Sequence, residues 1–197
     1  MRAVFASRNR HKAEQVGLIL SDIELVAIDD VAPDLQLVEP FSTFRANALH
    51  KGRVASDATG LPVIADDSGL EVPALGGAPG VQSARFAGEN ATDAENNAML
   101  VELLREVPPD GRGARYRCVA VFVAPDGEEI VTEGFCDGTL VLEGRGDLGF
   151  GYDPHFVPED ETRTMGEIPL EEKLRFSHRG RAFRALADRL AELGKLR

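Results

Sequence analysis

Two adjacent carboxylates, Asp66 and Asp67, follow the short apolar run 63–65 and precede Ser68 and Gly69. The pattern predicts a buried strand that ends at the two acids. Neighbouring carboxylates repel each other, and burying either one is costly without a cation or a proton. Three interpretations stay open from these residues: an Asx turn, a site for a hard cation such as Mg²⁺, or a general base that acts on water.

A candidate anion site lies near the N-terminus, between a strand predicted for 2–6 and a helix with apolar residues at 13, 16 and 20. The segment between them consists of Ser7, Arg8, Asn9, Arg10, His11 and Lys12. A loop that leads into a helix gathers free N–H groups at the positive end of the helix dipole. Ser7 and Asn9 add side-chain donors and Lys12 adds a full charge, although an ordinary helix N-cap also explains the first two.

Lysine is scarce, so its positions are informative. The chain has Lys12, Lys51, Lys173 and Lys195 and no others. Lys51 lies four residues after Asn47 in a helix predicted from Ser42-Thr43 to Gly60, so both side chains share one helix face. A solvated helix face is the alternative for this pair.

A glycine-rich stretch, 144–154, carries Phe150 and Tyr152 on either side of Gly151, with Asp153 next. Aromatic residues fixed between glycines can form a stacking slot for a base, or they can fold back onto the core. Further on, His178 and Arg179 open a helix whose apolar residues fall at 183, 186, 190 and 193. The helix dipole disfavours cations there, which indicates that this pair has a ligand to meet.

The rest of the sequence predicts the helices and strands that must position these residues. A second strand is predicted for 23–28, an acidic loop for 29–40, and an irregular glycine-rich segment for 75–88. Thr92 and Glu95 form a capping box that opens a helix with an apolar face at 100, 103, 104 and 107, which we interpret as structural. The segments 115–124 and 129–136 alternate as strands and predict a hairpin, which residues 139–142 extend.

Composition describes an ordinary globular protein of 197 residues that forms a single domain, 1–197, or two intimate lobes. A net charge of −11 argues against a nucleic-acid partner, and the absence of a long apolar run argues against a membrane partner. Cys118 and Cys136 are isolated and no secretory signal pattern is present, so we expect two buried thiols in a reducing, cytoplasmic compartment.

Taken together, these segments resemble the inosine triphosphate pyrophosphatases, also called XTP/dITP diphosphatases. The matching motifs run in the family's order along nearly the whole chain: Ser7-x-Asn9-x-x-Lys12, Thr43-Phe44-x-x-Asn47-Ala48-x-x-Lys51, Ala65-Asp66-Asp67-Ser68-Gly69-Leu70, Pro79-Gly80-Val81, Ser83-Ala84-Arg85-Phe86, Gly149-Phe150-Gly151-Tyr152-Asp153-Pro154, Glu172-Lys173 and Ser177-His178-Arg179. The resemblance implies an α/β fold with an elongated central mixed β-sheet flanked by helices, and two lobes with an active-site cleft between them. It also implies a homodimer.

The activity implied by this resemblance is Mg²⁺-dependent hydrolysis of non-standard purine nucleoside triphosphates (ITP, dITP and XTP) to the monophosphate and pyrophosphate. Asp67 would bind Mg²⁺ and act as the base, with Asp66 as a second candidate metal ligand. The substrate would be held by the residues that match the motifs: Ser7, Arg8, Asn9, Arg10, His11, Lys12, Asn47, Lys51, Ser68, Phe150, Gly151, Tyr152, Asp153, Lys173, His178 and Arg179. A donor such as His178 or Arg179 can meet the 6-oxygen of hypoxanthine or xanthine but would face the amino group of adenine.

Two positions depart from the family pattern. Ala46 stands where the family carries an acidic metal ligand, and Leu174 stands where an asparagine is usual. A methyl group cannot coordinate Mg²⁺, so the alternative is a nucleotide-binding homologue with impaired turnover.

Overall fold

The fold comes from a computed structural model that describes residues 1–196. Its strands are β1 (Arg2–Phe5), β2 (Glu24–Ala27), β3 (Val63–Glu71), β4 (Gly113–Val123), β5 (Glu129–Leu140) and β6 (Phe156–Pro158). Its α-helices are α1 (Arg10–Ile19), α2 (Ile28–Val31), α3 (Phe44–Thr59), α4 (Asp93–Leu104), α5 (Leu170–Phe176) and α6 (His178–Glu192).

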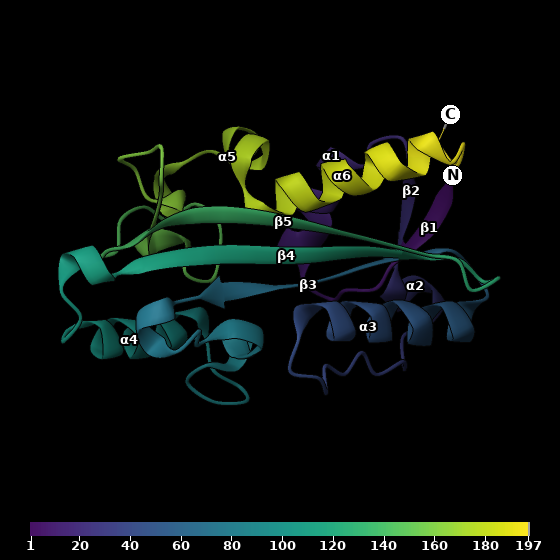
Figure 1. The fold of residues 1–197 in the computed structure, drawn as a ribbon. Coiled ribbons are helices and arrows are strands. Elements are labelled where there is room, and N and C mark those ends of the chain that lie inside the picture. The colour runs from purple at the N-terminus through teal and green to yellow at the C-terminus, as the bar shows by residue number, and fades with distance from the viewer. Residues whose placement is uncertain (197) are drawn as a thin grey trace. The chain divides into compact units, whose positions relative to one another are not determined.

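The strands form a six-stranded sheet in the order β2-β1-β3-β4-β5-β6. β1 pairs in parallel with both β2 and β3, whereas β5 and β6 pair antiparallel, so the predicted mixed sheet flanked by helices is confirmed (Figure 1). The chain divides into two compact units. Of the described residues, the first comprises 1–67, 118–134 and 178–196, and the second comprises 68–117 and 135–177. The strands β3, β4 and β5 contribute residues to both.

Local sequence signals explain where several helices begin and end. The Asn9 side chain caps α1 by accepting a hydrogen bond from the backbone N–H of Lys12 at 3.1 Å. Thr43 caps α3, and Gly60 ends it with a φ of 67°, a conformation that glycine adopts without strain. The capping box of Thr92 and Glu95 opens α4 as predicted.

The core of the first unit lies between the sheet and the helix pair α1 and α6. Val16 from α1, Phe183 and Leu186 from α6, and Phe5 and Ile64 from the strands are all buried in one cluster. Figure 1 shows α6 on one side of the strands and α3 on the other. The opposite face packs closely on α3, because a Cβ at Gly52 would lie 2.7 Å from the side chain of Val123. Both faces of the sheet are therefore covered in this unit.

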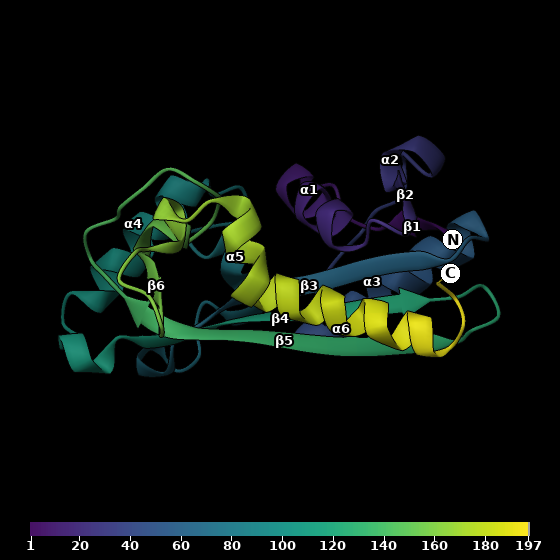
Figure 2. The same cartoon turned by 90° about the horizontal axis from the view of Figure 1, so that it is seen from above.

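The second unit has a core of its own. Leu100 and Leu104 of α4 are buried in one cluster with Tyr116 of β4 and with Tyr152 and Phe156. Figure 2 shows α4, β6 and α5 in this part of the chain. The glycine-rich stretch that carries Tyr152 is thus anchored to a core and is not a free loop.

Several predicted boundaries are wrong. The two acids do not end a strand or form a turn, because β3 continues through them to Glu71. The glycine-rich segment 75–88 has no strand or α-helix, as predicted, and it contains a 3₁₀ turn, Gly80–Arg85. The pattern also missed α2, α5 and β6, which are short, and it placed two leucines on buried faces, at 103 and 193, that the structure exposes.

Candidate active site

The predicted site residues fall into two groups, one in each unit. The first unit holds the segment 7–12, Asn47, Lys51, Asp66, Asp67, His178 and Arg179. The second unit holds Ser68, which is half-buried in β3, together with the segment 150–153 and Lys173.

Strand geometry separates the two acids of β3. Successive side chains of a strand point to opposite faces of the sheet, so Asp66 and Asp67 face different surroundings. Asp66 shares a face with Ile64, which packs in the cluster that contains α1 and α6. Asp67 lies on the other face and contacts a side chain of α3. Although they are neighbours in sequence, the two carboxylates have different partners.

Asp66 is a buried anion held by cations from two helices. Lys12 donates from Nζ to Asp66 Oδ2 at 2.9 Å, and Arg179 Nε lies 3.7 Å from the same oxygen. Burial alone would raise the pKa of Asp66, but the charges of Lys12 and Arg179 outweigh it and hold the pKa well below its usual range. Asp66 is therefore ionised at neutral pH, and it fixes two cationic side chains beside β3.

Asp67 has the opposite character. Burial raises its pKa to about 6, with a further contribution from the charge of Glu39, while Lys51 and Lys12 oppose the rise. Asn47 donates from Nδ2 to Asp67 Oδ2 at 3.0 Å and so fixes the orientation of the carboxylate. A carboxylate whose pKa lies near neutrality and whose position is fixed suits a general base.

Lys51 is buried and forms an ion pair with Glu39, which lies in the loop before α3. Although burial disfavours the charged form, Glu39, Asp66 and Asp67 together raise the pKa of Lys51. Asn47 holds this loop in place, since its Oδ1 accepts from the backbone N–H of Phe41 at 2.8 Å. The pattern of the sequence did not indicate Glu39, because one acid in an acidic loop carries no distinguishing signal.

The segment 7–12 forms the start of α1. Ser7 accepts from the backbone N–H of Asn9 at 3.2 Å, and Asn9 caps the helix, so the predicted N-cap is confirmed. Arg8 donates to Asp29 at 2.7 Å and to the carbonyl of Pro33 at 2.6 Å, which ties the segment to the following loop. Arg10 and His11 are exposed. Lys12 is the member of this segment that reaches the acids of β3.

The first turn of α6 places His178 and Arg179 next to the sheet. Gly134 of β5 permits this approach, because a Cβ there would overlap the backbone of His178 and Ala182. Arg179 donates to Gln15 of α1 at 2.8 Å and is almost fully buried. Within this unit Arg179 therefore binds Asp66 and Gln15, which explains why a cation is found in the first turn of a helix.

In the second unit, Asp153 and Lys173 form a buried ion pair at 2.8 Å. Asp153 also accepts from the hydroxyl of Tyr116 and from the backbone N–H of Phe150, both at 3.4 Å. A Cβ at Gly149, where φ is 97°, would collide with the carboxylate of Asp153 and the amine of Lys173. The ion pair therefore holds the glycine-rich loop in place through Asp153. Only glycine fits at position 149.

The two aromatic residues of this loop have different surroundings. Tyr152 is buried in the core of the second unit and donates its hydroxyl to the carbonyl of Ser83 at 2.8 Å. Burial and the charge of Asp93 raise the pKa of Tyr152. Phe150 is only half-buried. Of the two alternatives, folding back onto the core is confirmed for Tyr152, while stacking on a base stays a prediction for Phe150.

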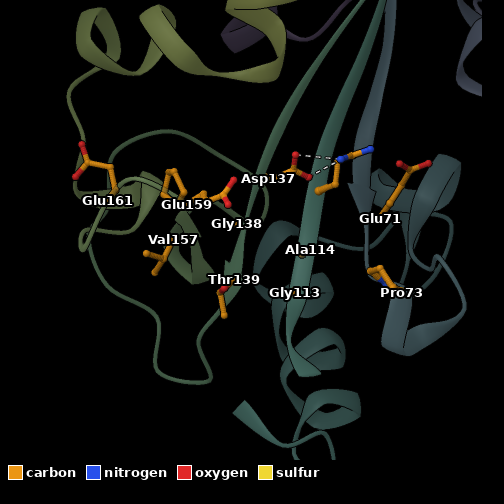
Figure 3. Close-up of a pocket in the computed structure, with 12 residues that line it drawn as sticks. Glu71, Pro73, Gly113, Ala114, Asp137, Gly138, Thr139, Val157, Glu159 and Glu161 are labelled. Atoms are coloured by element: carbon orange, nitrogen blue, oxygen red, sulfur yellow. Dashed lines mark hydrogen bonds and ion pairs between the residues drawn. The ribbon is translucent and has the colours of Figure 1, made fainter. Parts of the chain in front are cut away.

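A hollow of about 750 Å³ in the second unit is lined by none of the predicted site residues. Figure 3 shows the carboxylates of Glu71, Asp137, Glu159 and Glu161 around it. Among the described residues that line it, Arg115 is the one cation, and it donates to both carboxylate oxygens of Asp137, at 2.6 and 3.0 Å. Such a wall repels a polyphosphate, so the chemistry of the hollow does not match that of the predicted site.

The donors present fit a Mg²⁺ site that a substrate completes. In the part of the chain that the structure describes, no three His, Cys, Asp or Glu side chains gather into a group that could hold a metal ion. Mg²⁺ nevertheless needs only one or two carboxylates when substrate phosphates and waters supply the other ligands. Asp67 meets that requirement, whereas Asp66 lies on the opposite face and binds Lys12.

The chain is similar to known proteins along nearly its whole length. Residues 3–189 match the model of the Ham1 family. A dITP/XTP pyrophosphatase of Frankia alni is 47% identical over 202 residues, which cover 98% of each chain. One of Shigella flexneri is 45% identical and covers 96% of this chain and 98% of its own. The Ham1 protein of Staphylococcus aureus superposes with a TM-score of 0.89 at 38% identity, covering 98% of this chain and 100% of its own.

No helix among the described residues is both long enough and apolar enough to cross a membrane.

Proposed function

Because the chain belongs to the Ham1 family, we propose that it hydrolyses dITP, XTP and ITP to the nucleoside monophosphate and pyrophosphate. The observation that carries the proposal is the cluster of Lys12, Lys51, Asp66 and Asp67 around β3, in which each acid has its pKa altered by both lysines. A triphosphate needs cations to hold it, and its hydrolysis needs a base. Relatives named for this reaction match along nearly the whole chain, which supports the assignment.

In the proposed mechanism, Asp67 orients a water molecule and accepts its proton as the water attacks the α-phosphorus. Asn47 keeps the Asp67 carboxylate in position through the 3.0 Å hydrogen bond. Lys12 and Lys51 offset the negative charge that accumulates on the departing pyrophosphate. Asp67 would hold Mg²⁺ through its carboxylate, and the ion would supply neutralisation of charge on the phosphate oxygens.

We assign Asp66 a different role from the metal ligand that the sequence suggested. Its carboxylate binds Lys12 and lies close to Arg179, on the face of β3 opposite Asp67. Asp66 thus keeps two cations in place before a nucleotide arrives. Preorganised cations need no rearrangement during the reaction, which makes them more effective.

The loop 150–153 of the second unit is proposed to stack on the purine. Phe150 is half-buried in a loop that Asp153 and Lys173 hold, and an aromatic ring at such a position can stack on a base. His178 and Arg179 remain proposed donors toward the 6-oxygen. Magnesium as the metal, a homodimer and a cytoplasmic location are further parts of this proposal, and they rest on the family resemblance and the composition.

The test is pyrophosphate release from a substrate panel by the purified protein. We expect rapid release from dITP, XTP and ITP with MgCl₂, at least about a hundredfold slower release from dATP and dGTP, and none with EDTA. Asp67→Asn is the matched control, because it keeps the shape of the side chain and removes the base. Equal rates on all five nucleotides, or full activity of Asp67→Asn, would reject the proposal.

The comparisons do not support the alternative of a binding protein with impaired turnover. Relatives named dITP/XTP pyrophosphatase match 98% of the chain at 44–47% identity. Ala46 removes one carboxylate from the first turn of α3, but Asp67 and the charge of Glu39 remain beside Lys51.

A further inference from the structure

Two side chains of α4 hold the residue at the centre of the aromatic loop. The backbone N–H of Gly151 donates to Asp93 Oδ2 at 2.6 Å, and Asn97 donates from Nδ2 to the backbone oxygen of Gly151 at 2.8 Å. Asp93 and Asn97 are four residues apart, so they lie on one face of the helix. Both hydrogen-bonding groups of Gly151 are therefore satisfied by a single helix, and all three residues belong to the second unit.

These contacts fix the peptide groups on both sides of Gly151. Its N–H belongs to the peptide shared with Phe150, and its C=O belongs to the peptide shared with Tyr152. Since peptide groups are planar, the contact at the Gly151 N–H fixes the peptide that follows the Phe150 Cα, and the hydrogen bond from the Phe150 N–H to Asp153 Oδ2 fixes the peptide that precedes it. Together these two contacts set the direction in which the Phe150 side chain leaves the backbone. Gly151 itself has a φ of 62°, which is accessible to glycine and strained for most other residues.

The helix does not need either side chain for its own start. Thr92 and Glu95 already cap α4 through a complete capping box. The orientation of Asn97 is also fixed, because its Nδ2 donates to two carbonyls, those of Gly151 and Asp93, both at 2.8 Å. Its Oδ1 is buried without a hydrogen-bond partner among the described residues, an arrangement that costs stability and that the loop contact explains.

We propose that Asp93 and Asn97 are positioning residues that set the loop 150–153 for purine recognition. The inference rests on the proposed function, specifically on recognition of the base by this loop. Neither residue is assigned to contact the nucleotide. They position Phe150 indirectly, by holding the backbone of Gly151. The ion pair of Asp153 and Lys173 holds the same loop at Asp153.

The experiment compares Asp93→Ala and Asn97→Ala with the wild-type protein on dITP and dGTP. Because the proposed chemistry takes place at Asp67, we expect kcat for dITP to stay within about twofold while KM rises about fivefold, as for the loss of one hydrogen bond. The ratio of kcat/KM for dITP over dGTP should fall. Asp93→Asn keeps an oxygen that can accept from Gly151 and should restore most of the KM.

Glu95→Ala is the matched control, because it breaks the capping box in the same helical turn and does not touch Gly151. It should lower the melting temperature and leave KM and the substrate ratio unchanged. Amide hydrogen exchange at Gly151, measured by NMR, gives a readout that needs no substrate. It should be faster in Asp93→Ala than in Glu95→Ala.

Three outcomes would overturn the proposal. One is an unchanged KM in both alanine variants; another is an equal rise of KM in Glu95→Ala; the last is faster exchange at Gly151 without any change in KM or selectivity. A wild-type protein that releases no pyrophosphate from dITP would instead reject the proposed function, and that result is separate from the exchange measurement.

Discussion

Replacing Asp67 by asparagine should make the protein more stable at neutral pH while it removes activity. In the folded state burial raises the pKa of Asp67 from 3.8 to about 6. The folded protein therefore binds more protons than the unfolded chain between these two values. Its unfolding free energy consequently decreases as pH rises through this window. Asparagine keeps an oxygen that accepts the hydrogen bond from Asn47, but its side chain does not titrate. The unfolding free energy of the variant therefore does not decrease between about pH 4 and pH 6 as that of the wild-type protein does.

The magnitude follows from the difference in pKa. A difference of about 2 corresponds to about 3 kcal/mol of unfolding free energy, since each pKa unit is worth about 1.36 kcal/mol. We expect Asp67→Asn and the wild-type protein to be equally stable below about pH 4, and the variant to be about 2–3 kcal/mol more stable at pH 7.5. The assay is urea unfolding at several pH values, in EDTA so that no divalent cation binds the carboxylate.

At the neighbouring position, Asp66→Asn should have the opposite effect and make the protein less stable at neutral pH. The pKa of Asp66 is depressed, so its ionised form contributes stability above its unfolded pKa, and this contribution is lost as pH falls. Asparagine there leaves Lys12 and Arg179 without their counter-charge and should lower the unfolding free energy at pH 7.5 by about 3–5 kcal/mol. The reasoning is refuted if Asp67→Asn is less stable than wild type at pH 7.5, or if its advantage is the same at pH 4.

Three further predictions concern the same two units. Ala46→Glu adds a carboxylate to the first turn of α3 and should lower the Mg²⁺ concentration for half-maximal pyrophosphate release by about tenfold, with kcat at saturating Mg²⁺ unchanged; a large gain in kcat would revive the impaired-turnover hypothesis. Glu39→Gln removes the carboxylate that pairs with Lys51, so inhibition of dITP hydrolysis by pyrophosphate should tighten about fivefold, and a weaker inhibition constant would contradict this. Gly149→Ala forces a methyl group onto the pair of Asp153 and Lys173 and should lower the unfolding free energy by about 2–4 kcal/mol in urea, whereas Gly113→Ala, with open space around it, should change it by less than about 1 kcal/mol.

Helix ends and the hairpin were predictable because their signals are local. Asn9, Thr43 and the pair of Thr92 and Glu95 each satisfy backbone N–H groups within three residues, so a short window contains all the information. The β4–β5 hairpin follows from a turn with Gly127 at positive φ, which is equally local.

The path of β3 was not predictable in this way. Two acids followed by serine and glycine have the composition of a turn. A strand through buried carboxylates is stable only when other residues neutralise their charge, and the local sequence shows no such residues. Those partners, Lys12, Arg179 and Asn47, come from three helices that are distant in sequence. The same reason explains why Glu39, Asp93 and Asn97 were missed, since their contacts span 12, 58 and 54 residues.

The alternation of β3 also limits how the gene for such a protein can change. Inserting or deleting one codon within the strand, between Val63 and Asp66, would turn every following side chain of the strand to the other face. Asp66, which is ionised in the present structure, would then face Asn47 and α3. Asp67, whose pKa is raised, would face Lys12 and Arg179. Length variation within the strand is therefore expected to be tolerated only in steps of two residues, whereas the connection before it, residues 60–62, can absorb a single inserted residue.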